Sequence, residues 1–197
     1  MVSWELIIKI LVNIKRERMS ELSYVLLNSK ADKFDCGNAT INEYIEWSYF
    51  VTLSQQCYAY KILYKSLIVG YYMITLRDVA LTDCPGDESD YSVGEFGDHV
   101  PSLYINYIAI DKRFQKKGIG TKTLEKIIIE TRQLVDRLPI RFITINAVPE
   151  KVDWYKKIGF KEMGSNIDGV NRYMFIDIIR DKQKLVDYCE EQHSALI

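Results

Sequence analysis

The sequence of 197 residues holds only two histidines and four cysteines, and no two cysteines form a CxxC pair. Zinc sites and disulfide frameworks need clustered Cys and His ligands or regularly spaced cysteine pairs. Neither kind of site is therefore expected, and we predict no bound metal. Four isolated cysteines are typical of reduced, structural thiols in a cytoplasmic protein.

The chain also lacks an excess of charge of either sign, since its formal net charge is −1. A surface coated in positive charge for nucleic acid is thereby excluded, whereas a local basic patch is not. The apolar stretch 1–14 carries Glu5 and Lys9, is too short to cross a bilayer, and is followed rather than preceded by basic residues. We therefore predict no membrane contact. Residues 1–20 are expected to be an N-terminal extension that forms an amphipathic helix or a strand, or that lies upstream of a natural start at Met19.

Alternating apolar residues and turn signals predict one α/β domain over residues 21–180, followed by a polar helix or tail at 181–197. Strands are expected at 21–27, 56–64, 66–76, 103–110, 140–148, 160–163 and 172–179. Helices are expected after Thr40, over 119–138 and over 149–159. The unit 103–148 predicts two parallel strands joined by a right-handed crossover.

The first helix is predicted to begin with Thr40 as its N-cap, and Glu43 completes a capping box. Its predicted buried face consists of apolar residues at helical spacing, namely Ile41, Tyr44, Ile45 and either Trp47 or Ser48.

Residues 83–98 carry six acidic side chains and no basic one, and they include Pro85 and three glycines. This composition predicts a long loop or an insertion. The segment is either a solvated surface loop or a negative lip that attracts a cationic amine or a basic partner. Glu95 within it and His99 just after it are candidate substrate-binding residues.

The strongest signal is the stretch 104–124, YINYIAIDKRFQKKGIGTKTL, which predicts a buried strand, a basic loop and a helix. Such a loop leaves the first amides of the helix without partners, and these amides together with the helix dipole bind phosphate oxygens. Gly118 and Gly120 leave no Cβ where a phosphate would approach the backbone. Four basic side chains crowd the loop: Lys112, Arg113, Lys116 and Lys117. The alternative is a tight turn that binds no ligand.

The segment QKKGIG at 115–120 fits the Q/R-x-x-G-x-G/A signature of the GNAT acetyltransferases, and WYKKIGF at 154–160 resembles the tyrosine motif that follows one strand later in that family. The resemblance covers residues 21–179. It implies the GNAT fold, an α/β fold with a mixed sheet of six to seven strands, flanking helices, and a splayed pair of strands around 103–110 and 140–148. It also implies acetyl-CoA as the acetyl donor.

The resemblance further implies a donor site, position by position. Loop amides are expected to bind the pyrophosphate, the strand edge to pair with the pantetheine arm, and Asn146 to replace an asparagine that many members carry just before the last helix. The implied cofactor-binding residues are Ile108, Ala109, Ile110, Gln115, Lys116, Lys117, Gly118, Ile119, Gly120, Thr121 and Asn146.

Acetyl transfer to an amine requires a deprotonated amine, donors for the oxyanion, and an acid for the departing thiolate. The resemblance implies that Tyr155 is this acid, the alternative being a core tyrosine. The amide of Ile110 or of Ala109 is the implied oxyanion donor.

The base stays open. Tyr104 and Asn106 share one face of the predicted strand and are expected to line the acceptor slot. His99 and a water molecule are the other candidates.

The segment FDCGNATINEYIEW at 34–47 resembles the opening of the GNAT toxins of toxin–antitoxin modules, which acetylate aminoacyl-tRNA and are held in check by a small antitoxin. The net charge and the acidic segment oppose tRNA, because phosphate contacts dominate nucleic-acid affinity. The sequence therefore favours a small-molecule or protein amine and keeps aminoacyl-tRNA as the second acceptor. An inactive CoA- or partner-binding module is the non-enzymatic alternative, and a homodimer and an antitoxin are the candidate assemblies.

Overall fold

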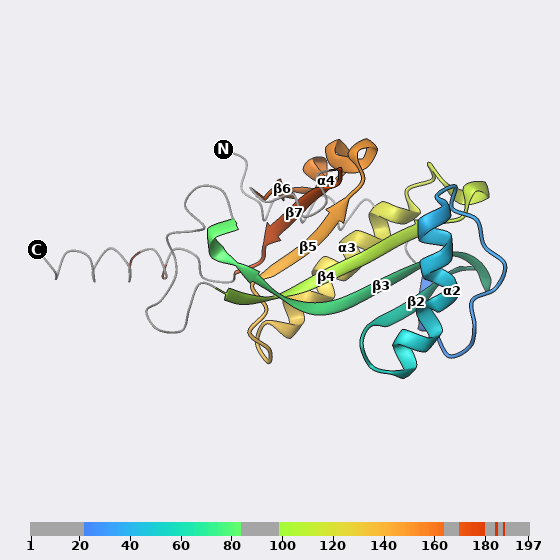
Figure 1. The fold of residues 1–197 in the computed structure, drawn as a ribbon, viewed down its shortest axis with the longest axis horizontal. Coiled ribbons are helices and arrows are strands. Elements are labelled where there is room, and N and C mark those ends of the chain that lie inside the picture. The colour runs from blue at the N-terminus through green and yellow to red at the C-terminus, as the bar shows by residue number, and fades with distance from the viewer. Residues whose placement is uncertain (1–21, 84–98, 164–169, 180–183, 185–186, 188–197) are drawn as a thin grey trace, which may run out of the picture.

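Residues 22–83, 99–163, 170–179, 184 and 187 are described by the computed structural model of the chain (Figure 1). They form a seven-stranded sheet in the order β1-β2-β3-β4-β5-β7-β6. The strands are β1 (Leu22–Leu26), β2 (Tyr58–Tyr64), β3 (Leu67–Ala80), β4 (His99–Ile110), β5 (Phe142–Ala147), β6 (Lys161–Glu162) and β7 (Arg172–Asp177). The helices are α2 (Ala39–Leu53), α3 (Ile119–Leu134) and α4 (Val152–Ile158), with short 3-10 turns η2 (Leu81–Asp83), η5 (Lys112–Phe114) and η6 (Pro149–Lys151). The predicted order of strands and helices is confirmed.

Neighbouring strands of the sheet are antiparallel except β4 and β5, which run parallel and are connected through α3. The parallel pair predicted for 103–148 is thus confirmed. β2 and β3 form a hairpin that turns at Lys65 and Ser66, whose φ angles are 48° and 67°. Two successive residues of positive φ match the twist of the strands that they connect.

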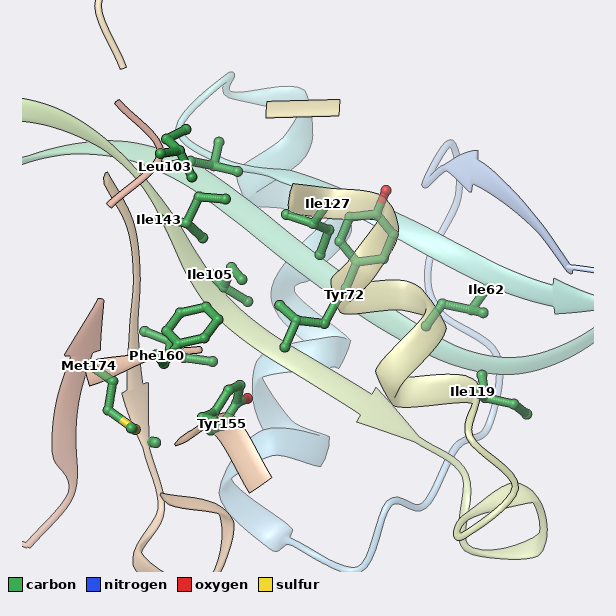
Figure 2. Packing of buried hydrophobic residues seen from close by; sticks show 14 of the residues in the cluster. Ile62, Tyr72, Leu103, Ile105, Ile119, Ile127, Ile143, Tyr155, Phe160 and Met174 are labelled. Carbon is green, nitrogen blue, oxygen red and sulfur yellow. The ribbon is translucent and has the colours of Figure 1, made fainter. Parts of the chain in front are cut away.

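Helices α3 and α4 cover one face of the sheet, and α2 covers the other (Figure 1). Beneath α3 and α4, Leu124 and Ile127 pack with Ile105 and Ile143 of the sheet in the larger core (Figure 2). Leu124 has no exposed surface, so its truncation to alanine would cost about 2–5 kcal/mol of folding free energy. Ile45 packs in a smaller core between α2 and the sheet.

The start of α2 differs from the prediction. Asn38 rather than Thr40 is the N-cap, because its Oδ1 accepts a hydrogen bond from the amide of Ile41 at 3.1 Å. Asn38 has the extended backbone of a capping residue, with φ −121° and ψ 114°. The helix therefore begins directly after the segment 34–38.

The buried face of α2 also differs from the prediction. It consists of Ile45, Ser48 and Thr52. Ser48 thus points inward, whereas Trp47 is 60% exposed and Tyr44 is 56% exposed. The apolar spacing of the sequence could not separate these faces, because aromatic residues lie on both.

Other element boundaries shift by a few residues. Helix α3 ends at Leu134 rather than at residue 138. Strands β3 and β4 are longer than predicted. Within β3, a Cβ on Gly70 would lie 2.4 Å from the carbonyl oxygen of Ala109, so a side chain at this position would force β3 and β4 apart.

Residues 1–20, residues 84–98 of the acidic segment and nearly all of the C-terminal tail lie outside the described residues. Within the residues described, no helix is both long and apolar enough to cross a bilayer. The same residues contain no group of three or more His, Cys, Asp and Glu side chains placed to hold a metal ion. Cys36 and Cys57 are free thiols.

Candidate active site

Strands β4 and β5 separate part of the way along their length. They pair only over residues 102–105 of β4 and 142–145 of β5. β4 continues to Ile110 while paired with β3, and β5 continues to Ala147 while paired with β7. The two strands therefore splay apart beyond Ile105, as predicted, and each has a backbone edge that the other does not satisfy.

The edge of β4 that faces the splay presents the amides of Ile108 and Ile110. The amide of Asp111 donates to the carbonyl of Val69 in β3 at 3.0 Å, and alternate residues of a strand point their amides in the same direction. By this alternation Ala109 directs its amide toward β3 and not toward the splay. Strand geometry thus supports Ile110 rather than Ala109 as an oxyanion donor, and it adds Ile108, which lies nearer to the point of divergence.

A β-bulge at Asn106 marks the point where the strands diverge. Ile105 and Tyr107 pair with consecutive residues of β3, so Asn106 is the extra residue. The bulge reverses the alternation of β4, so that Tyr104 and Tyr107 share the α2 side of the sheet. The side-chain oxygen of Asn106 is buried and has no hydrogen-bond partner among the described residues. Buried polar atoms are seldom left unpaired, and this oxygen can accept a hydrogen bond from a bound ligand.

Tyr155 of α4 lies in the larger core, together with Ile105 and Ala147 from the two splayed strands (Figure 2). It is 6% exposed, and its ring contacts those of Trp154 and Phe160 edge-on, at centroid distances of 4.6 and 5.5 Å. Burial raises the pKa of Tyr155 above its ordinary value of 10. The phenol is therefore protonated at neutral pH, as a proton donor must be, and it is at the same time a core residue.

The loop of residues 111–118 between β4 and α3, here termed the phosphate loop after its predicted ligand, holds two residues of positive φ. They are Lys116 at 61° and Gly118 at 81°. Gly118 is the N-cap of α3 and supplies no side chain to the helix end. The amides of residues 119–121 donate no hydrogen bond within the described part of the chain. These amides at the positive end of α3 are arranged as an anion site requires.

The two glycines of the signature have different roles. A Cβ on Gly118 would meet nothing within 4 Å, so its φ, and not crowding within the chain, calls for glycine. A Cβ on Gly120 would lie 3.8 Å from atoms of Ile110 and Trp154, which is ordinary contact. Alanine is therefore expected to be tolerated at Gly120 and not at Gly118.

Three of the four basic side chains of the phosphate loop are engaged within the chain. Lys112 pairs with a carboxylate of the segment before α2 at 2.6 Å. The guanidinium of Arg113 donates twice to the carboxylate of Asp111, at 2.9 Å each, and Lys117 donates to the carbonyl of Arg113 at 3.1 Å. Lys116 makes no hydrogen bond or ion pair with the described residues. It is the cation of this loop that is available to a phosphate.

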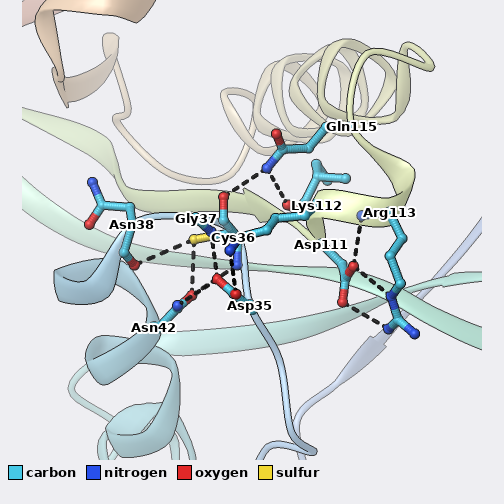
Figure 3. A network of polar contacts seen from close by, with 10 residues as sticks. Asp35, Cys36, Gly37, Asn38, Asn42, Asp111, Lys112, Arg113 and Gln115 are labelled. Atoms are coloured by element: carbon cyan, nitrogen blue, oxygen red, sulfur yellow. Dashed lines mark hydrogen bonds and ion pairs between the residues drawn. The ribbon is translucent and has the colours of Figure 1, made fainter.

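Residues 35–38 are held against the phosphate loop (Figure 3). The amide of Lys112 donates to the carbonyl of Asp35 at 3.0 Å, and its ammonium lies 2.6 Å from Asp35 Oδ2. Gln115 Nε2 donates to the carbonyls of Cys36 and Ile110, at 2.8 and 2.9 Å. These contacts are called the loop clamp below. Gln115, a predicted cofactor-binding residue, therefore uses its side chain to join two segments of the protein.

Two further predicted cofactor-binding residues lie beside the splay and the loop. Asn146 follows the last residue of β5 that pairs with β4. Thr121, in the first turn of α3, accepts a hydrogen bond from the indole of Trp154 at 3.3 Å. Trp154 precedes Tyr155, so this bond ties the first turn of α3 to the helix that carries the predicted acid.

The predicted substrate residues are not all brought together. Tyr104 faces the α2 side, with the guanidinium of Arg77 3.8 Å from its ring centroid. His99 opens β4, about 23 Å from Asn106 at the usual rise of a strand, so the structure does not bring it to the splay. Glu95 lies outside the described residues.

Sequence reasoning missed the part played by Asp35 and a buried contact on the other side of β4. There, Ser48 Oγ of α2 lies 2.6 Å from Tyr107 Oη, and burial raises the pKa of Tyr107 above its ordinary value. The partners are far apart in sequence, so no local period connects them. The one signal in the sequence was the resemblance of the segment that includes residues 34–38 to a family of toxins. That resemblance did not indicate which contacts these residues make.

The chain matches a family model described as an acetyltransferase (GNAT) domain over residues 89–171. The matched region contains β4, the phosphate loop, α3, β5 and Tyr155.

The chain is also similar to a tRNA-acetylating toxin of Mycobacterium tuberculosis (strain ATCC 25618 / H37Rv), with 27% identity over 84 residues. That match spans 43% of this chain and 48% of the toxin, about half the length of this curated relative.

Two solved structures resemble the fold. One is AtaT complexed with acetyl-methionyl-tRNAfMet, with a TM-score of 0.68 and 19% identity, covering 85% of this chain and 99% of that chain. The other is a mutant AtaT toxin bound to the C-terminus of the antitoxin AtaR and acetyl-CoA, with a TM-score of 0.62 and 19% identity, covering 81% and 94%.

Proposed function

From the GNAT acetyltransferase domain that this chain contains, we propose that the protein transfers the acetyl group of acetyl-CoA to the amino group of an aminoacyl-tRNA. The observation that carries the proposal is the splay between β4 and β5, with helix amides at its phosphate-loop end and a protonated tyrosine in the core beside it. The acceptor is supported by the likeness to a tRNA-acetylating toxin.

Acetyl-CoA is a cosubstrate whose parts correspond to distinct features of the site. The amides of residues 119–121 and the ammonium of Lys116 suit the pyrophosphate. The amides of Ile108 and Ile110 suit the pantetheine arm as an added strand would. Asn146 lies directly after the last residue of β5 that pairs with β4, and we propose it as a further contact to acetyl-CoA.

The transfer requires a new N–C bond and the loss of the C–S bond. The amine nitrogen, once deprotonated, attacks the thioester carbonyl. The oxyanion that forms accepts a hydrogen bond from the amide of Ile108 or Ile110. As the C–S bond breaks, Tyr155 donates its proton to the sulfur. The proton of the amine leaves through water, and the buried oxygen of Asn106 accepts from that amine or from that water.

We propose aminoacyl-tRNA as the first candidate acceptor, whereas the sequence alone favoured a small-molecule or protein amine. The preference for a small amine relied on the net charge of −1 and on the acidic segment, of which only Asp83 lies within the described residues. The described phosphate loop is basic, and AtaT, which shares the fold, is recorded with acetyl-methionyl-tRNAfMet. By the same likeness we propose a small antitoxin as the partner. The test is to express this protein alone and together with any small protein encoded next to it. If expression arrests growth and co-expression of that protein leaves the arrest unchanged, the antitoxin proposal is wrong.

The acceptor is tested by comparing kcat/KM for acetyl transfer to charged tRNA, to uncharged tRNA, to a polyamine, to an amino sugar and to a peptide amine. We expect charged tRNA to be acetylated at least tenfold more efficiently than the others, and uncharged tRNA not at all. A polyamine that outcompetes charged tRNA would overturn the acceptor and leave the donor chemistry standing. Binding of CoA without turnover on any acceptor would point to an inactive module.

A further inference from the structure

One carboxylate of the loop clamp contacts both the phosphate loop and the first turn of α2. A second path runs beside it, because Gln115 bonds the carbonyl of Cys36 and the amide of Cys36 donates to Asn42 Oδ1 at 3.0 Å. Asp35 Oδ2 pairs with Lys112 of the phosphate loop at 2.6 Å. Asp35 Oδ1 accepts from the amide of Gly37 at 2.8 Å and from Asn42 Nδ2, in the first turn of α2, at 3.1 Å. Figure 3 shows both sets of contacts around this side chain. The same carboxylate therefore holds the end of β4 and the start of α2.

We propose that Asp35 is a positioning residue that holds the phosphate loop in its acetyl-CoA-binding shape and couples acetyl-CoA binding to the first turn of α2. The inference relies on the proposed function for the identity of the ligand. Asp35 does not touch the reacting atoms, and it acts through Lys112 and Asn42.

The phosphate loop needs such support because its backbone is strained. Lys116 is a non-glycine residue with a φ of 61°, a backbone conformation that a residue with a Cβ adopts only at a cost. The first amides of α3, which would otherwise stabilise the helix start, have no partner in the described part of the chain. A loop in this state persists only where surrounding contacts fix it, and the loop clamp supplies them.

The alternative is that Asp35 binds Lys112 only while acetyl-CoA is absent and releases it to bind a phosphate. Two contacts argue against it. The amide of Lys112 bonds the carbonyl of Asp35, and Gln115 bonds the carbonyl of Cys36. Neither bond is released by a phosphate that attracts an ammonium. Lys116, which has no ion pair among the described residues, is the better placed cation.

The carboxylate is ionised under working conditions, since its contacts with Lys112, Gly37 and Asn42 lower the pKa of Asp35 to about 2. Its side chain is 54% exposed and that of Lys112 is 57% exposed. An exposed ion pair is weak and is screened by salt. The loss of Asp35 should therefore weaken binding only modestly, and less at high salt.

The test is calorimetric titration of the full-length protein with CoA, for the wild type and for Asp35→Asn, Asp35→Glu and Asp32→Asn. We expect Asp35→Asn to weaken CoA binding by about three- to tenfold, the range of one or two modest hydrogen bonds. Asp35→Glu should recover part of the loss. Asp32→Asn is the matched control, because Asp32 lies in the same segment, pairs only distantly with Lys61 at 4.0 Å, and should stay within about twofold of the wild type. Tighter or unchanged CoA binding by Asp35→Asn would overturn the inference.

Hydrogen exchange separates positioning from simple loss of structure. In the wild type, CoA should slow exchange of the amides of Ile41 and Asn42, which bond to Asn38 at the start of α2. In Asp35→Asn, CoA at a saturating concentration should leave these two rates unchanged. Equal slowing in both proteins would refute the coupling. A wild type that does not bind CoA at all would instead refute the proposed function.

Discussion

The two halves of the molecule are built by different kinds of contact. The donor half, comprising β4, the phosphate loop, α3 and α4, presents mostly backbone groups whose directions follow from local geometry. The other half comprises residues 31–38, α2, β2 and β3, and we term it the acceptor half after its proposed ligand. It is joined to the donor half by side chains distant in sequence, such as Ser48 with Tyr107 and Asp35 with Lys112. Changes in the donor half, or at Asp35 where the loop clamp joins the two halves, should therefore alter acetyl-CoA binding or chemistry. Changes elsewhere in the acceptor half should alter stability or acceptor use.

The largest effect is expected from Tyr155→Phe. Removing the hydroxyl should lower kcat by about 10²–10⁴-fold, the range of general acid catalysis. CoA affinity and melting temperature should barely change, because the ring contacts remain and the hydroxyl makes no hydrogen bond to a described residue. The rate of CoA thiol release measures kcat, and Tyr58→Phe, at a 45% exposed tyrosine, is the matched control. A kcat within about threefold of the wild type would show that Tyr155 is only a core residue.

Ser48→Ala should chiefly affect stability. It leaves the buried hydroxyl of Tyr107 without its 2.6 Å partner, at a cost of about 1–3 kcal/mol of unfolding free energy. Tyr107→Phe should cost less, because Ser48 keeps its 2.7 Å hydrogen bond to the carbonyl of Tyr44. Urea titrations measure both, and the double variant should be less destabilised than the sum of the two. If Ser48→Ala also changes the affinity for CoA, this contact contributes to the donor site, and the expected separation between the two halves is wrong here.

Gly118→Ala should reduce CoA affinity by about tenfold, because a Cβ at φ 81° costs about 1–2 kcal/mol. Gly120→Ala is the control, since its Cβ would make only ordinary contacts at 3.8 Å. Both are measured by titration with CoA. If the two variants bind CoA equally well, the left-handed backbone at Gly118 is not required for the anion site.

The smallest effect concerns the pH dependence of kcat/KM. Burial raises the pKa of Tyr155, so the donor form persists as pH rises and no falling limb should appear below about pH 10. The rising limb should follow the acceptor amine, with a pKa of about 7.7–8.0 for an α-amino group against about 10.4 for an alkyl amine. A rising limb that continues to pH 10 with the natural acceptor would favour a polyamine or a lysine side chain.

Much of the donor half could be predicted from the sequence because its signals are local. The glycine spacing of the phosphate loop, the apolar strand before it and the helix after it all lie within 104–124. The order of strands and helices and the parallel pair followed from periodicity and turn residues, and the structure confirms them. The bulge at Asn106 could not be predicted, since it depends on the register between β3 and β4.

The acceptor half was less predictable because its contacts are long-range. The N-cap of α2 shifted to Asn38, next to the segment that the loop clamp holds. In α2, Ser48 points inward because its hydroxyl hydrogen-bonds with both Tyr107 and the carbonyl of Tyr44. The neighbouring Trp47 is exposed. Neither choice follows from the polarity of single residues.

The proposed transfer to aminoacyl-tRNA is tested by locating the acetyl group after the reaction. Purified protein is incubated with charged tRNA and with acetyl-CoA that carries an isotopic label in its acetyl group. The amino acid is then released from the tRNA by mild base, and its mass is measured by mass spectrometry. We expect labelled N-acetyl amino acid with the wild type and at least about a hundredfold less of it with Tyr155→Phe. An unlabelled amino acid from charged tRNA, while a polyamine in the same mixture is acetylated, would contradict the proposed transfer.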